Sequence, residues 1–168
     1  LDSTVVSGSI DKFGGAARFS RILTAIDAAD TAITRNTTTI KMRKDFTVVE
    51  NTPASYEICF EQGLELNTQN AVIGSTGFKF VDDTNTYYFE DDTKGNIYTY
   101  YFSSSGEKTI KDAQFGTIDY VKGEIMIGYT TAVTFASTIL PGSTIQVRAI
   151  PLGQDVVAKK SVYLDLDV

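Results

Sequence analysis

The spacing of hydrophobic residues changes twice along this chain. No period is sustained over residues 1–12, where we expect an arm that leads into the fold. Apolar residues then recur at the spacing of one helix face, at Phe19, Ile22, Leu23 and Ile26. This spacing is typical of an amphipathic helix. We place the helix at 16–34, because Gly14 and Gly15 disfavour a helix interior.

From residue 37 the hydrophobic period shortens to two, the period of a strand with one buried face. Apolar side chains alternate with polar ones at Ile40, Met42, Phe46 and Val48. The segment YEICFE at 56–61 repeats this alternation. If the two strands pair antiparallel, Lys41 and Arg43 would face Glu57 and Glu61 across the pair.

Short strands separated by turn signals continue to the end of the chain. The turn signals are GSTG, DDTN, DDTKGN, SSSG, VKG and PGS. The strands are expected at 71–74, 77–81, 86–90, 96–102, 107–111, 115–120, 124–129, 144–150 and 161–167. Many short strands after one helix predict a single α+β domain over 1–168. In it, 37–168 form a mostly antiparallel β-sandwich or partly closed barrel.

Aromatic residues crowd the strands expected at 86–90 and 96–102. Because successive side chains of a strand point to opposite faces, one set enters the core. The other set must cover a loop, a neighbouring subunit or a ligand. We expect a protein interface there, with Tyr98, Tyr100 and Tyr101 as candidates. A platform on which sugar stacks is the alternative.

The segment FGTIDYVKGEIMI at 115–127 predicts a hairpin. We interpret Tyr120–Gly123 as a type I turn followed by Gly123 at a positive φ, which is the pattern of a three-residue hairpin loop with a bulge at the glycine. Asp119 lies before the turn, where a carboxylate can accept backbone N–H bonds. Both residues are therefore expected to shape the turn and to carry no chemistry.

The composition of the chain excludes several classes of partner and of catalytic site. Hydrophobic residues make up 42% of the 168, so a core can form. The net charge of −6 argues against a nucleic-acid partner. No apolar run approaches the roughly 18 residues of a membrane span, so no membrane contact is expected. With no histidine and only Cys59, the chain lacks an internal disulfide, a zinc cluster and histidine-based nucleophilic machinery.

Acidic residues gather at turns instead of in a facing pair. The segment EDDTKGN at 90–96 superficially suggests a calcium loop, but it lacks the closing glutamate. We interpret it as a solvated turn with Gly95 or Asn96 at a positive φ. Glycosidase chemistry needs two carboxyl groups across a cleft, and the sequence offers no such pair. We therefore expect no enzyme activity, no metal and no cofactor.

Three segments taken together resemble one protein family. They are the helix and strand FSR-x-L-x-A-IDA-x-D and I-x-RNTTT-x-x-x-R, the hairpin G-x-IDY-x-x-G-x-I, and TIQVRAIPLGQDV leading into KKSVYLDLD. Their order and spacing are similar to the C-terminal region of the large baseplate wedge subunit of contractile-tailed (T-even type) bacteriophages. The resemblance covers about residues 13–50 and 115–168.

The resemblance implies a structural virion protein of the tail baseplate, assembled in the host cytoplasm. Family members associate with copies of themselves and with other wedge proteins, and no catalytic residue is implied. We expect a homo-oligomer, most simply an isologous dimer. A surface buried against the sheet or a second copy is expected at Phe19, Ile22, Leu23 and Ile26. A chain that begins at Leu1 would be a C-terminal piece of a longer protein. The alternative function is a carbohydrate-binding β-sandwich of a tail or cell-surface protein.

Overall fold

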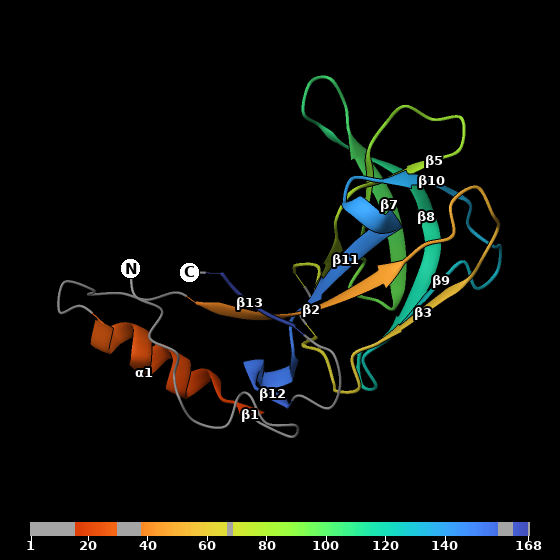
Figure 1. Ribbon diagram of the computed structural model, residues 1–168. Coiled ribbons are helices and arrows are strands. Elements are labelled where there is room, and N and C mark those ends of the chain that lie inside the picture. Colours follow the sequence, from red (N-terminus) through yellow and green to blue (C-terminus); the bar gives the residue numbers. More distant parts are fainter. Residues whose placement is uncertain (1–15, 30–37, 67–68, 158–162, 168) are drawn as a thin grey trace.

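Antiparallel strands make up most of this protein. The computed structural model describes residues 16–29, 38–66, 69–157 and 163–167. Its large sheet curls around a hydrophobic core as an open half-barrel, and the helix lies near one end of that sheet (Figure 1). The fold is therefore β-rich with one short described α-helix, and the arm predicted at 1–12 lies outside the described residues.

Eleven strands form the large sheet, in the order β13-β2-β11-β4-β6-β7-β8-β9-β3, with β5 paired to β6 and β10 paired to β5. A separate two-stranded sheet joins β1 to β12. In chain order the elements are β1 (Ala16–Ala17), α1 (Phe19–Ala29), β2 (Thr39–Thr47), β3 (Tyr56–Cys59), β4 (Ile73–Ser75), β5 (Phe78–Phe80), β6 (Tyr87–Asp91), β7 (Asn96–Phe102), β8 (Lys108–Asp119), β9 (Glu124–Ile127), β10 (Phe135–Thr138), β11 (Thr144–Ala149), β12 (Val156–Val157) and β13 (Tyr163–Asp167), with short 3-10 turns at Pro141–Ser143 and Leu152–Gln154.

Phenylalanine rings fill the interior of the half-barrel. Phe78, on β5, lies at the centre of this cluster: its ring centroid is 5.0 Å from that of Phe135 and 6.0 Å from that of Phe115. Burying one such side chain contributes roughly 1.5–3 kcal/mol to folding. The aromatic cluster thus joins strands that are far apart in the sequence, β5, β8 and β10.

Helix α1 begins three residues later than the sequence predicted. Its predicted first turn belongs to β1, which pairs with β12. The backbone N–H of Phe19 then donates to the carboxylate Oδ1 of Asp155 at 2.9 Å. An acid at this position bonds a first-turn N–H that has no partner inside the helix. A contact between residues far apart in the sequence therefore fixes the first residue of the helix. The predicted end of the helix, at 30–34, lies outside the described residues.

Strands β2 and β3 do not pair with each other, so no shared ladder places Lys41 and Arg43 opposite Glu57 and Glu61. β2 lies between β11 and β13, and β3 pairs with β9. The two strands face each other across an open seam instead. The ammonium group of Lys44 donates to the carbonyl of Cys59, and the rings of Phe46 and Tyr56 lie 5.6 Å apart. The half-barrel is thus bridged by side chains at this seam.

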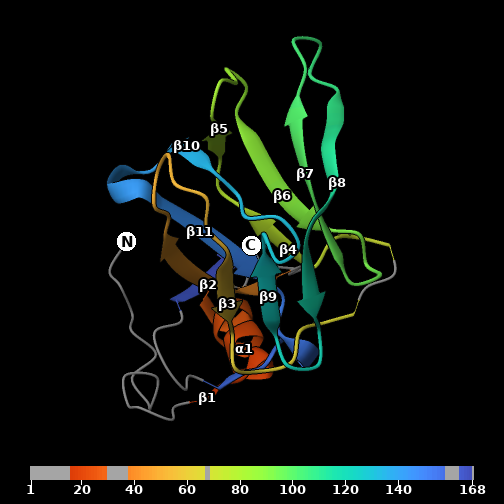
Figure 2. The ribbon, with the colours of Figure 1, turned by 90° about the vertical axis from the view of Figure 1, so that its right-hand side faces the viewer.

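Strand β8 joins two segments that the sequence predicted as separate strands. Its register against β7 shifts between Ile97 and Thr99, and again between Thr99 and Tyr100. Such bulges bend a strand and break the alternation of its side chains, so the period cannot be followed through KDAQ. Beyond the bulges the β7–β8 hairpin projects from the body of the sheet (Figure 2).

Candidate interaction surface

Strands β6 and β7 carry aromatic side chains on both faces. On the inner face Tyr87 is fully buried, and the ring of Tyr101 lies 5.5 Å from it. The outer face carries Tyr88, Tyr98, Tyr100 and Phe102, which we call the outer aromatic strip. Of the three candidate tyrosines, Tyr98 and Tyr100 therefore share the outer face. Tyr101 faces the core, because it stands at the opposite phase of the alternation.

The rings of the outer aromatic strip pack mainly on one another. Tyr100 is only 8% exposed, although it does not belong to the core cluster. Tyr88 stacks on it at 5.7 Å, and Phe102 meets it edge-on at 5.6 Å and 87°. Phe102 and the neighbouring Ile110 of β8 remain 54% and 58% exposed. Apolar surface therefore lies at the outer end of the strip.

Glu90 anchors the other end of the strip. Its carboxylate accepts hydrogen bonds from the hydroxyl of Tyr100 at 2.6 Å, from that of Tyr98 at 3.0 Å, and from Lys108. The Lys108 ammonium also lies 4.0 Å from the ring centroid of Tyr100. Burial opposes ionisation of Glu90, but the bonds from Lys108 and Tyr100 outweigh it and lower the pKa. Burial and the bond to Glu90 both raise the pKa of Tyr100.

Removing the charge of Glu90 should reduce stability in a pH-dependent way. A folded pKa below the ordinary 4.5 means that ionised Glu90 stabilises the fold above that value. This contribution is lost as the pH falls through the folded pKa. At pH 7, Glu90→Gln should lose about 1–2 kcal/mol of unfolding free energy in urea titrations. The loss should shrink on acidification, and Glu57→Gln, an exposed strand glutamate, is the control. Equal losses at pH 7 and pH 3 would contradict this assignment.

The apolar face of helix α1 is only partly covered. No side chain of the helix is fully buried. Phe19 and Ile22 pack against the core, while Leu23 and Ile26 are half-buried. Of the four residues predicted to form a buried helix surface, the two in the first turn, Phe19 and Ile22, thus contact the body of the fold. Whether a second copy covers the rest stays a prediction.

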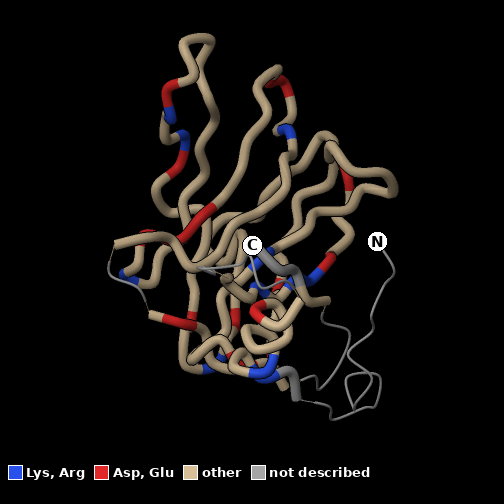
Figure 3. Tube along the Cα trace, turned by 90° about the vertical axis from the view of Figure 1, so that its left-hand side faces the viewer, with Lys and Arg blue, Asp and Glu red and all other residues tan. Residues whose placement is uncertain are grey.

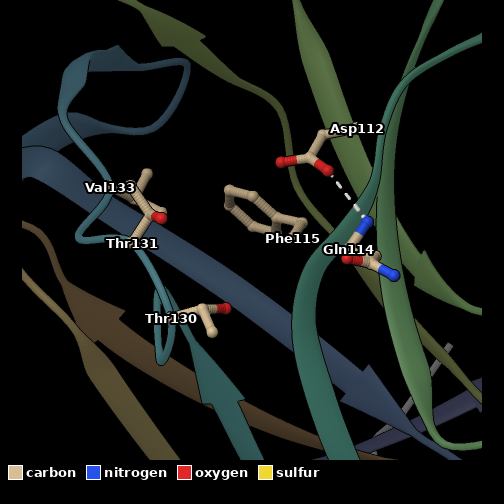
Figure 4. Close-up of a pocket in the computed structure, with 6 residues that line it drawn as sticks. All are labelled: Asp112, Gln114, Phe115, Thr130, Thr131 and Val133. Carbon is tan, nitrogen blue, oxygen red and sulfur yellow. Dashed lines mark hydrogen bonds between the residues drawn. The ribbon is translucent and has the colours of Figure 1, made fainter.

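A pocket of about 290 Å³ opens at the bend of β8. It is lined by Asp112, Gln114, Phe115, Thr130, Thr131 and Val133, and Figure 4 shows β8 on one side and the loop after β9 on the other. The backbone N–H of Gln114 donates to the carboxylate of Asp112 at 2.8 Å. Phe115 is buried and belongs to the core. The lining thus holds one carboxylate, without the facing acid that glycosidase chemistry needs.

The acidic turn at 90–96 is not wholly solvated, contrary to the prediction. Asp91 is 2% exposed, and its carboxylate accepts bonds from the N–H groups of Val72, Ile73 and Thr93 and from the hydroxyl of Tyr120. Burial and the bond to Asp91 raise the pKa of Tyr120. Asp91 shares the phase of Tyr87 and Phe89, which is the signal in the sequence that could have placed it inside.

Asp119 and Gly123 shape the hairpin between β8 and β9. The Asp119 carboxylate accepts bonds from the N–H groups of Val121 and Lys122 at 3.0 and 3.1 Å. Gly123 has a φ of 70°, and its N–H donates to the Asp119 carbonyl at 2.8 Å. Because Asp119 pairs with Glu124, four residues form the loop, one more than predicted. Neither residue lines the pocket.

Two further findings concern the described residues only. No group of three or more cysteine, aspartate or glutamate side chains among them is placed to hold a metal ion. No helix among them has the length and apolarity that crossing a membrane requires.

Comparison of the chain with family models, with curated proteins and with solved structures found no match.

Proposed function

We propose that this protein is a non-enzymatic assembly module that binds other protein chains, a second copy of itself included. The observation that carries the proposal is the outer face of β6–β8. There Phe102 and Ile110 leave apolar side chains in solvent beside rings that are already packed. Surfaces of this composition, with aromatic residues at the centre and polar groups around them, are typical of protein interfaces.

The setting we propose is the tail baseplate of a contractile-tailed phage, with other wedge proteins as further partners. The resemblance of 13–50 and 115–168 to the large wedge subunit supports this setting. The β-rich fold and the single carboxylate of the pocket are compatible with a structural role.

The outer aromatic strip favours a protein partner over a sugar. A sugar platform needs exposed rings in one plane, and Tyr98 and Tyr100 are inclined by 46° to each other. Their hydroxyls are also engaged by Glu90. A glycan array tests the alternative directly, because binding that depends on Tyr98 would establish it.

Self-association is the first expected result of the proposal. Sedimentation velocity should show a dimer whose fraction rises with protein concentration, because exposed apolar surface is removed from water on pairing. Phe102→Lys and Ile26→Lys place a charge on the strand surface and on the helix surface separately, and the surface in contact is the one whose variant dissociates. Unchanged urea unfolding of the monomer is the control for each. A wild-type chain that stays monomeric at its solubility limit would contradict self-association.

A further inference from the structure

The outer half of β8 is a sheet edge with one neighbour. Over Lys108–Asp112 it pairs with β7, and β9 joins its other side only from Gly116 onward. Within the described part of the chain, no other strand pairs with this stretch. The edge lies on the projecting β7–β8 hairpin, away from the body of the sheet (Figure 2). An edge of this kind is a template for another strand.

The backbone groups that face outward along this edge can be identified. The N–H of Ser103 donates to the carbonyl of Glu107 at 2.9 Å, so these two residues form a hydrogen-bonded pair. Hydrogen-bonded and non-hydrogen-bonded pairs alternate along an antiparallel ladder. The N–H and C=O of Thr109 therefore point toward β7, and those of Lys108 and Ile110 point to the free edge.

We propose that this edge pairs with the same edge of a second copy, antiparallel about a two-fold axis beside Thr109. The proposal rests on the self-association proposed above and names its surface and register. Lys108 of each copy would exchange backbone hydrogen bonds with Ile110 of the other. Thr109 would face Thr109 in a non-hydrogen-bonded pair, and two β6-β7-β8 sheets would become one.

The charges along the edge complement themselves in this register. Glu107 of each copy lies opposite Lys111 of the other, so two opposite-charge pairs form at once. The Lys111 ammonium lies 5.9 Å from the ring centroid of Tyr87, an inner-face residue, so Lys111 shares the face of Thr109. Figure 3 shows acidic and basic positions together on this hairpin. An axis at Ile110 would instead pair Lys108 with Asp112, but the Lys108 ammonium is already bonded to Glu90 at 2.5 Å.

The apolar side chains complement themselves as well. Ile110 lies opposite Tyr100 of β7 and is 58% exposed. In the proposed register the two Ile110 side chains are diagonal neighbours across the axis, a distance that side chains still span. Lysines on an edge commonly hinder pairing. Here Lys108 is held by Glu90. Lys111 lies 3.5 Å from Asp83, but its side chain is 51% exposed and can turn to Glu107 of the other copy in the dimer.

A disulfide cross-link tests the register. Cα atoms of a non-hydrogen-bonded pair lie about 4.5 Å apart, within the range of a disulfide. Thr109→Cys in a Cys59→Ser background should therefore run as a covalent dimer after mild oxidation by oxidised glutathione. Thr117→Cys is the matched control, because Thr117 is an exposed threonine of the same strand that lies between β7 and β9. Equal cross-linking at both positions would overturn the proposal.

A charge swap tests the pairing of Glu107 with Lys111 without any cysteine. Each of Glu107→Lys and Lys111→Glu should raise the dissociation constant of the dimer by about tenfold, because two attractive pairs become repulsive. The double variant should recover most of that loss, since each charge again meets its opposite. No recovery in the double variant would overturn the register.

The results of these experiments distinguish a failure of the β8 contact from a failure of self-association as such. A concentration-dependent dimer that neither cross-links at residue 109 nor responds to the charge swap would overturn the β8 contact alone. Self-association would then stand and use another surface. A chain that remains monomeric at its solubility limit, in wild type and in every variant, would overturn both.

Discussion

Asp91→Ala is expected to lower the free energy of unfolding by about 3–5 kcal/mol. The carboxylate is 2% exposed and accepts bonds from the N–H groups of Val72 and Ile73 at 2.6 and 2.9 Å. Both donors belong to buried residues, so water cannot replace the lost acceptor. A domain of ordinary stability has about 5–15 kcal/mol in total, so this loss is a large fraction of the stability of the fold.

Two variants separate the role of the acceptor from the loss of volume. Asp91→Asn keeps the shape and the Oδ1 acceptor of Val72 and Ile73, but it places an amide NH2 where Oδ2 accepts from Thr93 and Tyr120. Its loss should therefore lie between those of Tyr120→Phe and Asp91→Ala. Tyr120→Phe removes only the hydroxyl bond of 2.7 Å and should cost about 1 kcal/mol. Urea unfolding monitored by circular dichroism measures all three. If Asp91→Asn were as stable as wild type, the bonds that Oδ2 accepts from Thr93 and Tyr120 would contribute nothing to this turn.

Gly123→Ala should cost about 3 kcal/mol or more. Gly123 has a φ of 70°, where an L side chain is strained. An added Cβ would also stand 2.1 Å from the carbonyl oxygen of Gln62. That oxygen belongs to the backbone, so the strand ends on both sides would have to move.

Gly106→Ala is the matched control for this effect. Gly106 has a φ of 80°, and an added Cβ would meet no atom within 4 Å. Its loss should therefore be the backbone strain alone, about 1–2 kcal/mol. The difference between the two variants in thermal and urea unfolding measures the clash with Gln62. Equal losses would show that close packing of the hairpin against Gln62 does not contribute.

Local pattern predicted which segments form strands better than it predicted their partners. The period of two in 39–48 and in 96–102 corresponds to β2 and β7. It carries no information on pairing: the sequence permits β2 to pair with its neighbour β3, whereas its partners are β11 and β13. The sequence does not predict strand β10, because TFAST is too short and too weakly alternating to distinguish from a loop.

Most of the contacts and strand edges that the sequence did not predict involve residues that break their local hydrophobic pattern. Lys44 stands at a phase that alternation assigns to the interior, and it bridges the seam to β3. Asp91 stands at the phase of the core and satisfies buried N–H groups. The free edge of β8 depends on a register shift that no period reveals. The outer aromatic strip could be anticipated, because it needs only alternation along two strands.

The strand order also determines when the fold can be completed during synthesis. β2 leaves the ribosome about a hundred residues before β11, the strand that covers its edge. The hairpins from β6 to β9 are local and can form in the meantime, whereas Ile40 and Met42 must wait for their neighbours. Long-range pairing of this kind is slow, since the intervening loop has to close first. The strands that bury β2, β11 and β13, thus follow the local hairpins in the sequence, so the native core cannot be completed until both have been synthesised.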